Sequence, residues 1–200
     1  MQLIVATRNA HKTREIQRIL GPAFTVSDLS AHPKIPDIRE TGKSFEENAI
    51  LKAVGVSIHL PGLIVADDSG LEVDVLGGAP GIFSARYAGK DATDKQNIDK
   101  LLGELAQIGA SGANRSARFR CVIALARQGK LFGTFNRIVE GTIIEHARGS
   151  GGFGYDPIFV PRGFEETFAE LPADVKNTIS HRAKAVRALA VKLAAFKPMG

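Results

Sequence analysis

The fold of this chain is organised around the stretch VADDSGLEVD at residues 65–74, which is followed by GGAPG at residues 77–81. The apolar run from Leu63 to Ala66 predicts a short buried strand that ends on two adjacent carboxylates, Asp67 and Asp68. Burying a carboxylate costs several kcal/mol unless it is paired or bound to a metal, so we expect a cation beside this pair. The Ser-Gly that follows allows the tight turn of a ligand-holding loop, although an ordinary Asp-Ser-Gly turn has the same sequence.

Helix and strand patterns extend from this stretch in both directions. We predict strands at residues 3–6, 24–29 and 158–160, and helices at residues 10–20, 44–60, 93–107 and 180–196. Residues 116–126 and 131–140 predict a hairpin, and Gly141 allows a second reversal into residues 142–144. The pattern therefore predicts an α/β fold in which helices flank a mixed sheet, with the hairpin part as a second lobe of one domain, residues 1–200.

Composition narrows the class of protein. Of the 200 residues, 44% are hydrophobic and 24% are charged, which is ordinary for a soluble globular domain. The formal net charge is +5, but the basic residues are scattered among the acidic ones without a block of like charge. This distribution favours an anionic small substrate over a nucleic-acid tract.

Cysteine content and hydropathy indicate a cytoplasmic protein. Cys121 is the only cysteine, so no internal disulfide is expected, and its apolar neighbours predict a buried structural thiol. The first residues lack the charged lead and the length of a signal-peptide core. No apolar run approaches the roughly 18 residues that a membrane span needs, so we expect no membrane segment.

A polar segment lies between the first predicted strand and the first predicted helix. Amides at a helix start bind phosphate, aided by the helix dipole, and hydroxyl, amide and ammonium side chains add donors. A Thr or Asn helix cap beside a surface lysine would have the same sequence. The candidate substrate-binding residues of this segment are Thr7, Arg8, Asn9, Ala10, His11 and Lys12.

Oxygen ligands for a metal come from two places in the sequence. Glu40 precedes the helix that begins near Ser44, and we expect it to join Asp68, with or without Asp67, around one cation. Such a ligand set favours Mg²⁺, with Mn²⁺ as a substitute, over zinc, and the histidines show no metal-ligand spacing. The alternative for Glu40 is a solvated loop acid.

Two further polar segments follow towards the C-terminus. The stretch FGYDP at residues 153–157 combines a stackable aromatic ring, a glycine that permits close approach and a carboxylate acceptor. The stretch KNTISHR at residues 176–182 places several donors directly before a helix, where a helix cap and surface charges are the plain alternative. The candidate substrate-binding residues here are Phe153, Gly154, Tyr155, Asp156, Lys176, His181 and Arg182.

Four blocks of the sequence resemble the inosine/xanthosine triphosphate pyrophosphatase family. They are Thr7-x-Asn9-x-x-Lys12; Glu40-Thr41-Gly42 with Phe45-x-Glu47-Asn48-Ala49; Asp67-Asp68-Ser69-Gly70-Leu71 with GGAPG at 77–81; and FGYDP at 153–157 with Ser180-His181-Arg182. Each block alone is weak evidence for the family, but four blocks in the same order along the whole chain are highly specific for it. Arg8 is the main departure, because the family often has a small residue there.

The resemblance implies a three-layer α/β/α fold with two lobes, a substrate cleft between them and assembly as a homodimer. It also implies a Mg²⁺-assisted attack of water on the α-phosphorus of ITP, dITP or XTP, which yields the monophosphate and pyrophosphate. Asp68 matches the catalytic position and Glu40 the metal-side carboxylate. The segment from Thr7 to Lys12, with Ser69, matches the phosphate side, and the residues near the C-terminus match the base side.

The base-side donors suggest how the purine is selected. Inosine and xanthine carry a 6-keto acceptor where adenine carries an amino donor. His181 and Arg182, facing that atom, would be left unpaired by adenine, which gives roughly 10⁴–10⁵-fold discrimination.

Two other functions fit parts of the sequence. The related septum-inhibition pyrophosphatases act on modified pyrimidine or 7-methylguanine nucleotides, but the Ser180-His181-Arg182 triplet and the FGYDP stretch argue against that group. A basic RNA-binding module would explain the net charge and Arg115, Arg118 and Arg120, yet these arginines lack interleaved exposed aromatic residues. We therefore expect purine nucleoside triphosphates as partners, and no nucleic acid or membrane.

Overall fold

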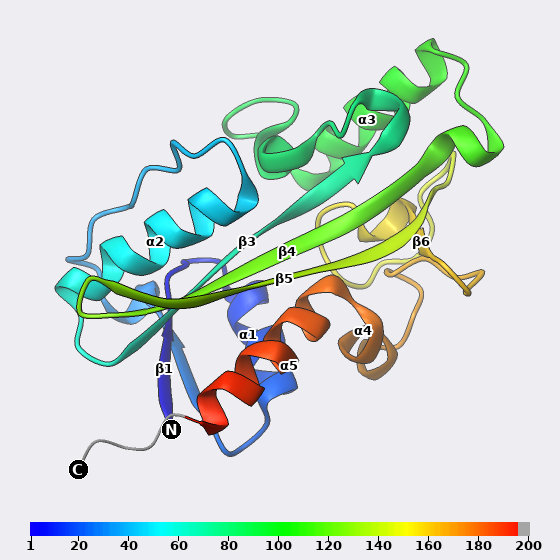
Figure 1. Cartoon of the computed structure of the whole chain (residues 1–200). Coiled ribbons are helices and arrows are strands. Elements are labelled where there is room, and N and C mark those ends of the chain that lie inside the picture. The colour runs from blue at the N-terminus through cyan, green and yellow to red at the C-terminus, as the bar shows by residue number, and fades with distance from the viewer. Residues whose placement is uncertain (196–200) are drawn as a thin grey trace. The chain divides into compact units, whose positions relative to one another are not determined.

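The structure, a computed structural model, describes residues 1–195 and contains a six-stranded sheet in the order β2-β1-β3-β4-β5-β6 (Figure 1). The strands are β1 (Gln2–Val5), β2 (Thr25–Asp28), β3 (Leu63–Val73), β4 (Ser116–Arg127), β5 (Lys130–Ile143) and β6 (Phe159–Pro161). The helices are α1 (Ala10–Leu20), α2 (Phe45–His59), α3 (Asp94–Gln107), α4 (Ala173–Ile179) and α5 (His181–Ala194). β1 pairs in parallel with β2 and β3, and β6 pairs antiparallel with β5, so the prediction of a mixed α/β sheet is confirmed.

Contacts divide the chain into two compact units. The first unit consists of residues 1–68, 121–137 and 182–195, and the second consists of residues 69–120 and 138–181. β3, β4 and β5 each run from one unit into the other. Each unit has its own hydrophobic core.

The first unit has three layers. α2 lies on one side of β1 and β3, and α1 and α5 lie on the other side (Figure 1). Strands and helices share a core on the α1 and α5 side, formed by residues such as Leu3, Val5, Val65, Ile123, Ile16 and Leu189. Side chains alternate along a strand, so the buried Ile4 and Ile64 face α2, which buries Phe45, Ala49, Ala53 and Val56.

The second unit has a core between α3 and the strands. α3 buries Ile98, Leu101 and Leu105 in a cluster with residues of β3, β4, β5 and β6. The rings of Phe119 and Phe159 meet within it, with centroids 4.7 Å apart. These aromatic contacts anchor the start of β6, directly after the turn at Asp156–Ile158.

Capping residues in the sequence set the helix starts. Ser44 Oγ accepts the Glu47 amide at 3.1 Å, and Thr93 and Gln96 form a reciprocal capping box at the start of α3. α1, α2 and α3 accordingly begin within one residue of the predicted positions. The predicted end of α5 at residue 196 lies outside the described residues, and no helix among residues 1–195 is long and apolar enough to cross a membrane.

Two predicted strand ends are wrong. β3 does not stop at Ala66 but continues to Val73, so both aspartates lie inside the strand and their charges are compensated there by buried cations. β5 passes straight through Gly141, where no reversal occurs, because the absent side chain lets β6 pack closely. A Cβ atom on Gly141 would lie 2.3 Å from the Val160 carbonyl oxygen.

The polar stretch before the last helix also differs from the prediction. No helix was predicted directly before Ser180, but residues 176–179 belong to α4, and Ser180 separates α4 from α5. β6 starts one residue later than predicted because Asp156–Ile158 forms a 3₁₀ turn. The predicted hairpin turn is confirmed, since Gln128 and Gly129 both have positive φ, as a two-residue hairpin requires.

Candidate active site

β3 carries the two adjacent carboxylates of the first unit. Because strand side chains alternate, Asp67 shares the face of Val65, towards α1 and α5, whereas Asp68 shares the face of Ile64, towards α2. Both aspartates are buried, with side-chain exposures of 0% and 11%. The strand therefore presents one carboxylate to each helical layer.

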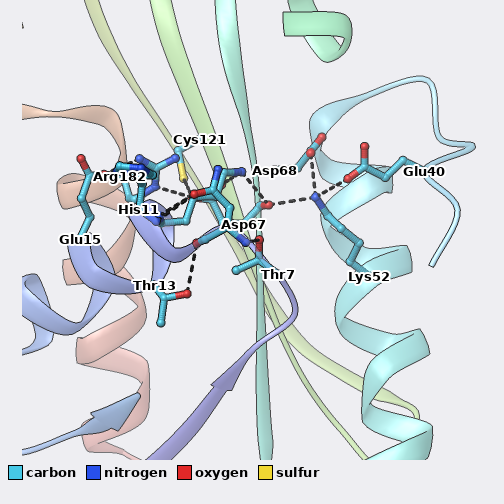
Figure 2. A network of polar contacts seen from close by, with 12 residues as sticks. Thr7, His11, Thr13, Glu15, Glu40, Lys52, Asp67, Asp68, Cys121 and Arg182 are labelled. Atoms are coloured by element: carbon cyan, nitrogen blue, oxygen red, sulfur yellow. Dashed lines mark hydrogen bonds and ion pairs between the residues drawn. The ribbon is translucent and has the colours of Figure 1, made fainter. Parts of the chain in front are cut away.

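Asp67 lies in a closed network of cations, which we call the Asp67 network (Figure 2). Its Oδ1 accepts from Lys12 Nζ of α1 at 2.5 Å, and its Oδ2 accepts from Arg182 Nε of α5 at 2.8 Å. The Cys121 thiol donates to the same Oδ2 at 3.2 Å, and Arg182 Nη1 donates to Glu15 of α1 at 2.5 Å. All charges in this network are matched by opposite charges or donors.

The network shifts the ionisation of its members. Burial alone would raise the pKa of Asp67, but the Arg182 guanidinium and the Lys12 ammonium outweigh it and hold that pKa well below its ordinary value. Burial and the neighbouring Asp67 carboxylate raise the pKa of the Cys121 thiol well above its ordinary value. Asp67 is therefore ionised at neutral pH, and Cys121 is the buried structural thiol that the sequence predicts.

Asp68 lies on the other face of β3 in a second cluster, the Asp68 network. Lys52 Nζ of α2 donates to Asp68 Oδ1 at 2.9 Å, to Glu40 Oε1 at 2.8 Å and to the Asp67 carbonyl oxygen at 3.0 Å. Figure 2 shows this ammonium between the two carboxylates. Burial raises the pKa of Asp68 above its ordinary value, although Lys52 opposes that shift. A carboxylate with a raised pKa is suited to accept a proton.

The Asp68 network fits a divalent cation. Asp68 Oδ2 is buried and has no hydrogen-bond partner among residues 1–195, which leaves one oxygen for a further ligand. Mg²⁺ is commonly held by one or two carboxylates together with water and substrate phosphates. No three His, Cys, Asp or Glu side chains gather as a metal site among the described residues, and Asp67 does not join Glu40 and Asp68, because it lies on the opposite face.

The segment from Thr7 to Lys12 forms the start of α1. Asn9 caps the helix, its Oδ1 accepting the amides of His11 at 2.9 Å and Lys12 at 3.4 Å, and Thr7 Oγ1 accepts the Asn9 amide at 3.1 Å. The helix-cap alternative is thus present in the structure, and phosphate binding by Ala10, His11 and the rest of this segment stays a prediction. The Lys12 side chain reaches β3, where its Nζ donates to Asp67 Oδ1.

Arg8 faces away from the helix start. Its guanidinium donates to the carbonyl oxygens of Leu29 and Ile35, both at 2.8 Å, and pairs with Asp37 at 3.1 Å. The unusual arginine therefore ties the loop after β2 to the end of β1. Its contact with substrate stays a prediction.

The base-side residues of the second unit also form a network. Asp156 Oδ2 accepts the Phe153 amide at 2.8 Å and Lys176 Nζ at 2.6 Å, and that ammonium lies 5.2 Å from the Phe153 ring centroid. Gly152 has φ +73°, and a Cβ atom there would lie 2.0 Å from Asp156 Oδ2. The Tyr155 hydroxyl donates to the Ser84 carbonyl oxygen at 2.9 Å. The loop is therefore held in one shape by its own buried carboxylate.

His181 and Arg182 are neighbours in sequence but belong to different units. His181 stacks on Phe119 in the second unit, with ring centroids 4.8 Å apart and planes at 11°. Arg182 is fully buried in the Asp67 network of the first unit, where Nε and Nη1 are engaged. Ser69, predicted on the phosphate side, lies half-buried in β3. Substrate contacts of these three residues stay predictions.

Several residues of the networks were not predicted from the sequence. Lys52 was missed, although a lysine within the apolar run from Ala49 to Val56 is a recognisable signal. Glu15 was missed as well, although it lies three residues after Lys12 on one face of α1. Nothing local indicates that Asp94 accepts the Gly154 amide at 2.7 Å, because the two are 60 residues apart.

Comparison with known proteins gives the same family as the four sequence blocks. The model of the Ham1 family matches residues 3–192. The chain is 46% identical over 195 residues to the dITP/XTP pyrophosphatase of Bacillus subtilis (97% of this chain, 98% of the relative) and 51% identical over 195 residues to that of Streptomyces coelicolor (94% of each).

A solved structure supports the same family assignment. The structure of a HAM1 protein from Coxiella burnetii is 40% identical and superposes with a TM-score of 0.86, covering 98% of this chain and all of that one. The family resemblance inferred from the four blocks is confirmed, and this chain belongs to the Ham1 family.

Proposed function

We propose that this protein hydrolyses ITP, dITP and XTP to the nucleoside monophosphate and pyrophosphate, and so removes non-canonical purines from the nucleotide pool. One observation carries the proposal: β3 presents a buried carboxylate with a raised pKa and one open oxygen, Asp68, beside a second carboxylate and two lysines. Relatives at about half identity are named dITP/XTP pyrophosphatases, which supports the substrate class.

Asp68 is the catalytic residue in this proposal. Its open Oδ2 accepts the proton of the water that attacks the α-phosphorus while the bond to the pyrophosphate leaving group breaks, and its raised pKa makes it a stronger base than an ordinary aspartate. Glu40 and Asp68 would hold Mg²⁺, with Mn²⁺ as a substitute, and Lys52 balances the two carboxylates. Bound Mg²⁺ supplies charge neutralisation on the phosphates and makes water more acidic.

The remaining residues bind the two ends of the nucleotide. Lys12 and the Thr7–Asn9 turn bind phosphate, since Asp67 holds Lys12 and an ammonium suits phosphate. In the second unit, Phe153 offers a ring for the purine, and Lys176 and His181 offer donors to a 6-keto oxygen. When adenine binds instead, its 6-amino group cannot accept a hydrogen bond, so the donors of the site stay unpaired.

The RNA-binding alternative is not favoured. Arg118 pairs with Asp74 at 2.7 Å and with Glu140 at 3.2 Å, and Arg120 pairs with Glu72 at 3.1 Å. Arg115 is buried and donates to the Ile143 carbonyl oxygen at 2.7 Å. These guanidiniums are engaged within the protein. We also propose that the protein works in the cytoplasm and as a homodimer, as the family resemblance implies.

A panel of nucleoside triphosphates with separate detection of pyrophosphate and orthophosphate tests the function. We expect ITP, dITP and XTP to yield pyrophosphate with Mg²⁺ present, and ATP and the pyrimidine triphosphates to yield little. Asp68→Asn keeps the shape and removes the charge, so turnover should fall by about 10²–10⁴-fold or more without loss of fold. Orthophosphate as the first product from ITP would disprove the proposed bond cleavage.

A further inference from the structure

The loop that carries Glu40 contains neither helix nor strand, so something else must hold its carboxylate in place. Residues 36–42 have no regular structure, and the Glu40 side chain is about a quarter exposed. The neighbouring α2 supplies the nearest fixed groups. The side chain of Asn48, fully buried in α2, accepts the Gly42 amide at 2.9 Å through its Oδ1.

One face of α2 holds this loop at two points. Asn48 and Lys52 are four residues apart in the helix, so they lie one turn apart on the same face. Asn48 holds the backbone at Gly42, and Lys52 holds the Glu40 carboxylate at 2.8 Å. The two loop residues are themselves only two positions apart, so the backbone contact limits where the carboxylate can lie.

The loop also packs directly on the helix. A Cβ atom on Gly42 would lie 2.6 Å from the Glu47 Cβ and 2.7 Å from Asn48 Oδ1. The backbone of Gly42 does not have positive φ, so the absence of a side chain serves close approach and not a special turn. The contact between loop and helix therefore depends on glycine at this position.

No second hydrogen bond to the described part of the chain explains why the Asn48 side chain is buried. Its Nδ2 is buried and has no hydrogen-bond partner among residues 1–195. A buried amide that is only half satisfied is costly, so packing alone would favour an apolar side chain at this position. Among residues 1–195, the one hydrogen bond that the Asn48 side chain makes is the one to the Gly42 amide, on the loop of Glu40.

We propose that Asn48 is a positioning residue that sets the Glu40 carboxylate for a divalent cation by holding the Gly42 amide. This inference rests on the proposed function only in assigning the cation to Glu40 and Asp68. Groups that orient a metal ligand typically change metal affinity by about 10–100-fold when they are removed. Asn48 acts here through the loop and touches no reacting atom.

Two independent variants test the inference. Asn48→Ala removes the acceptor, and Gly42→Ala leaves the acceptor but pushes the loop off the helix. Both should weaken Mn²⁺ binding to the nucleotide-free protein, followed by electron paramagnetic resonance, by about tenfold. In steady-state assays with ITP the Mg²⁺ concentration for half-maximal rate should rise by a similar factor, while kcat at saturating Mg²⁺ stays within threefold of the wild type.

The matched control is Ser44→Ala, which removes the cap of the same helix but does not touch Gly42. It should lower the unfolding temperature and leave Mn²⁺ affinity unchanged. Wild-type Mn²⁺ affinity in either folded variant, or no Mn²⁺ binding by the wild type, would overturn the inference. A wild type that binds Mn²⁺ but does not hydrolyse ITP would disprove the proposed function alone, because the Mn²⁺ titration decides the role of Asn48 independently.

Discussion

At the scale of single residues, Asp67 and Asp68 show how neighbours in sequence acquire different chemistry. Asp67 meets a guanidinium, an ammonium and a thiol, so both of its oxygens are occupied. Asp68 meets one ammonium and keeps one oxygen open. Their pKa values move in opposite directions, downwards for Asp67 and upwards for Asp68, because cations outweigh burial only at Asp67. The first aspartate organises cations, and the second is available for proton transfer.

Asp67→Asn should destabilise the protein by about 3–5 kcal/mol at pH 7, because it removes the buried carboxylate charge that pairs with both Lys12 and Arg182. The native pKa of Asp67 lies below the unfolded value, so its stabilisation is present above about pH 4 and is lost as pH falls through the native pKa. Urea unfolding at pH 7, 5 and 3 measures the difference in free energy of unfolding between the variant and the wild type. This difference should be smaller at pH 3 than at pH 7 and 5. Asp99→Asn, in an exposed pair, should cost less than about 1 kcal/mol. A gap that is constant with pH would contradict this account.

Lys52→Met should make stability fall with rising pH in metal-free protein. The pKa of Asp68 is already raised by burial, and the ammonium of Lys52 opposes that shift, so its removal raises the pKa further. A carboxyl with a raised native pKa contributes stability below its unfolded value of about 3.9, and that contribution is lost as pH rises through the native value. Thermal unfolding in EDTA from pH 5 to 8 measures the slope, with the exposed Lys130→Met as control. A slope equal to that of the wild type would show that Lys52 does not compensate Asp68.

At the scale of elements, the edge of the sheet depends on close packing of β5 and β6. The pair is antiparallel, with Gly141 opposite Pro161 and Ile143 opposite Phe159. Phe159 is fully buried and contacts Phe119 and Phe168, so it cannot move away from β5 without opening the core. The glycine in β5 is what allows this approach.

Gly141→Ala should destabilise the protein by about 1–3 kcal/mol through overpacking. The new methyl group would lie 2.3 Å from the Val160 carbonyl oxygen and 2.5 Å from the Phe159 ring. Gly103→Ala in α3 is the matched control, because no atom lies within 4 Å of its Cβ position and alanine favours a helix by up to about 1 kcal/mol. Urea midpoints should therefore move in opposite directions for the two variants. An unchanged urea midpoint for Gly141→Ala would mean that β6 can move away from β5 at no cost in stability.

At the scale of the whole molecule, three strands are shared between the two compact units. β3, β4 and β5 each contribute residues to both cores. Neither unit has a complete set of strands of its own. We therefore expect the two units to unfold together, as parts of one folding domain.

Calorimetry should accordingly show one unfolding transition, with calorimetric and van't Hoff enthalpies equal, as for a two-state domain. β3, β4 and β5 are continuous through both units, so unfolding of one unit would fray the strands of the other. Near-ultraviolet circular dichroism gives an independent probe, because Tyr87 and Tyr155, the two tyrosines, lie in the second unit. Different midpoints from the two methods would show that the units unfold separately.

The sequence by itself determined the elements and the family. Caps at Ser44 and Thr93 and the Gln128-Gly129 turn act over a few residues, so their effects are visible in the sequence. The four motif blocks identified the family because residue types in order along a chain need no coordinates. The metal-side pair of Glu40 and Asp68 was proposed from the same blocks, and both carboxylates do bind one ammonium.

Only the tertiary structure decided which partners those residues meet. The length of β3 depends on cations from α1, α2 and α5, which compensate its aspartates from as far as 115 residues away in sequence. Successive side chains of β3 point to opposite faces of the sheet, so Asp67 and Asp68 lie on different faces. The predicted strand ended at Ala66, so this separation could not be inferred from the sequence. Lys52, Glu15 and Asn48 have roles for the same reason: a buried charge or amide acquires its function from the group that folding places against it.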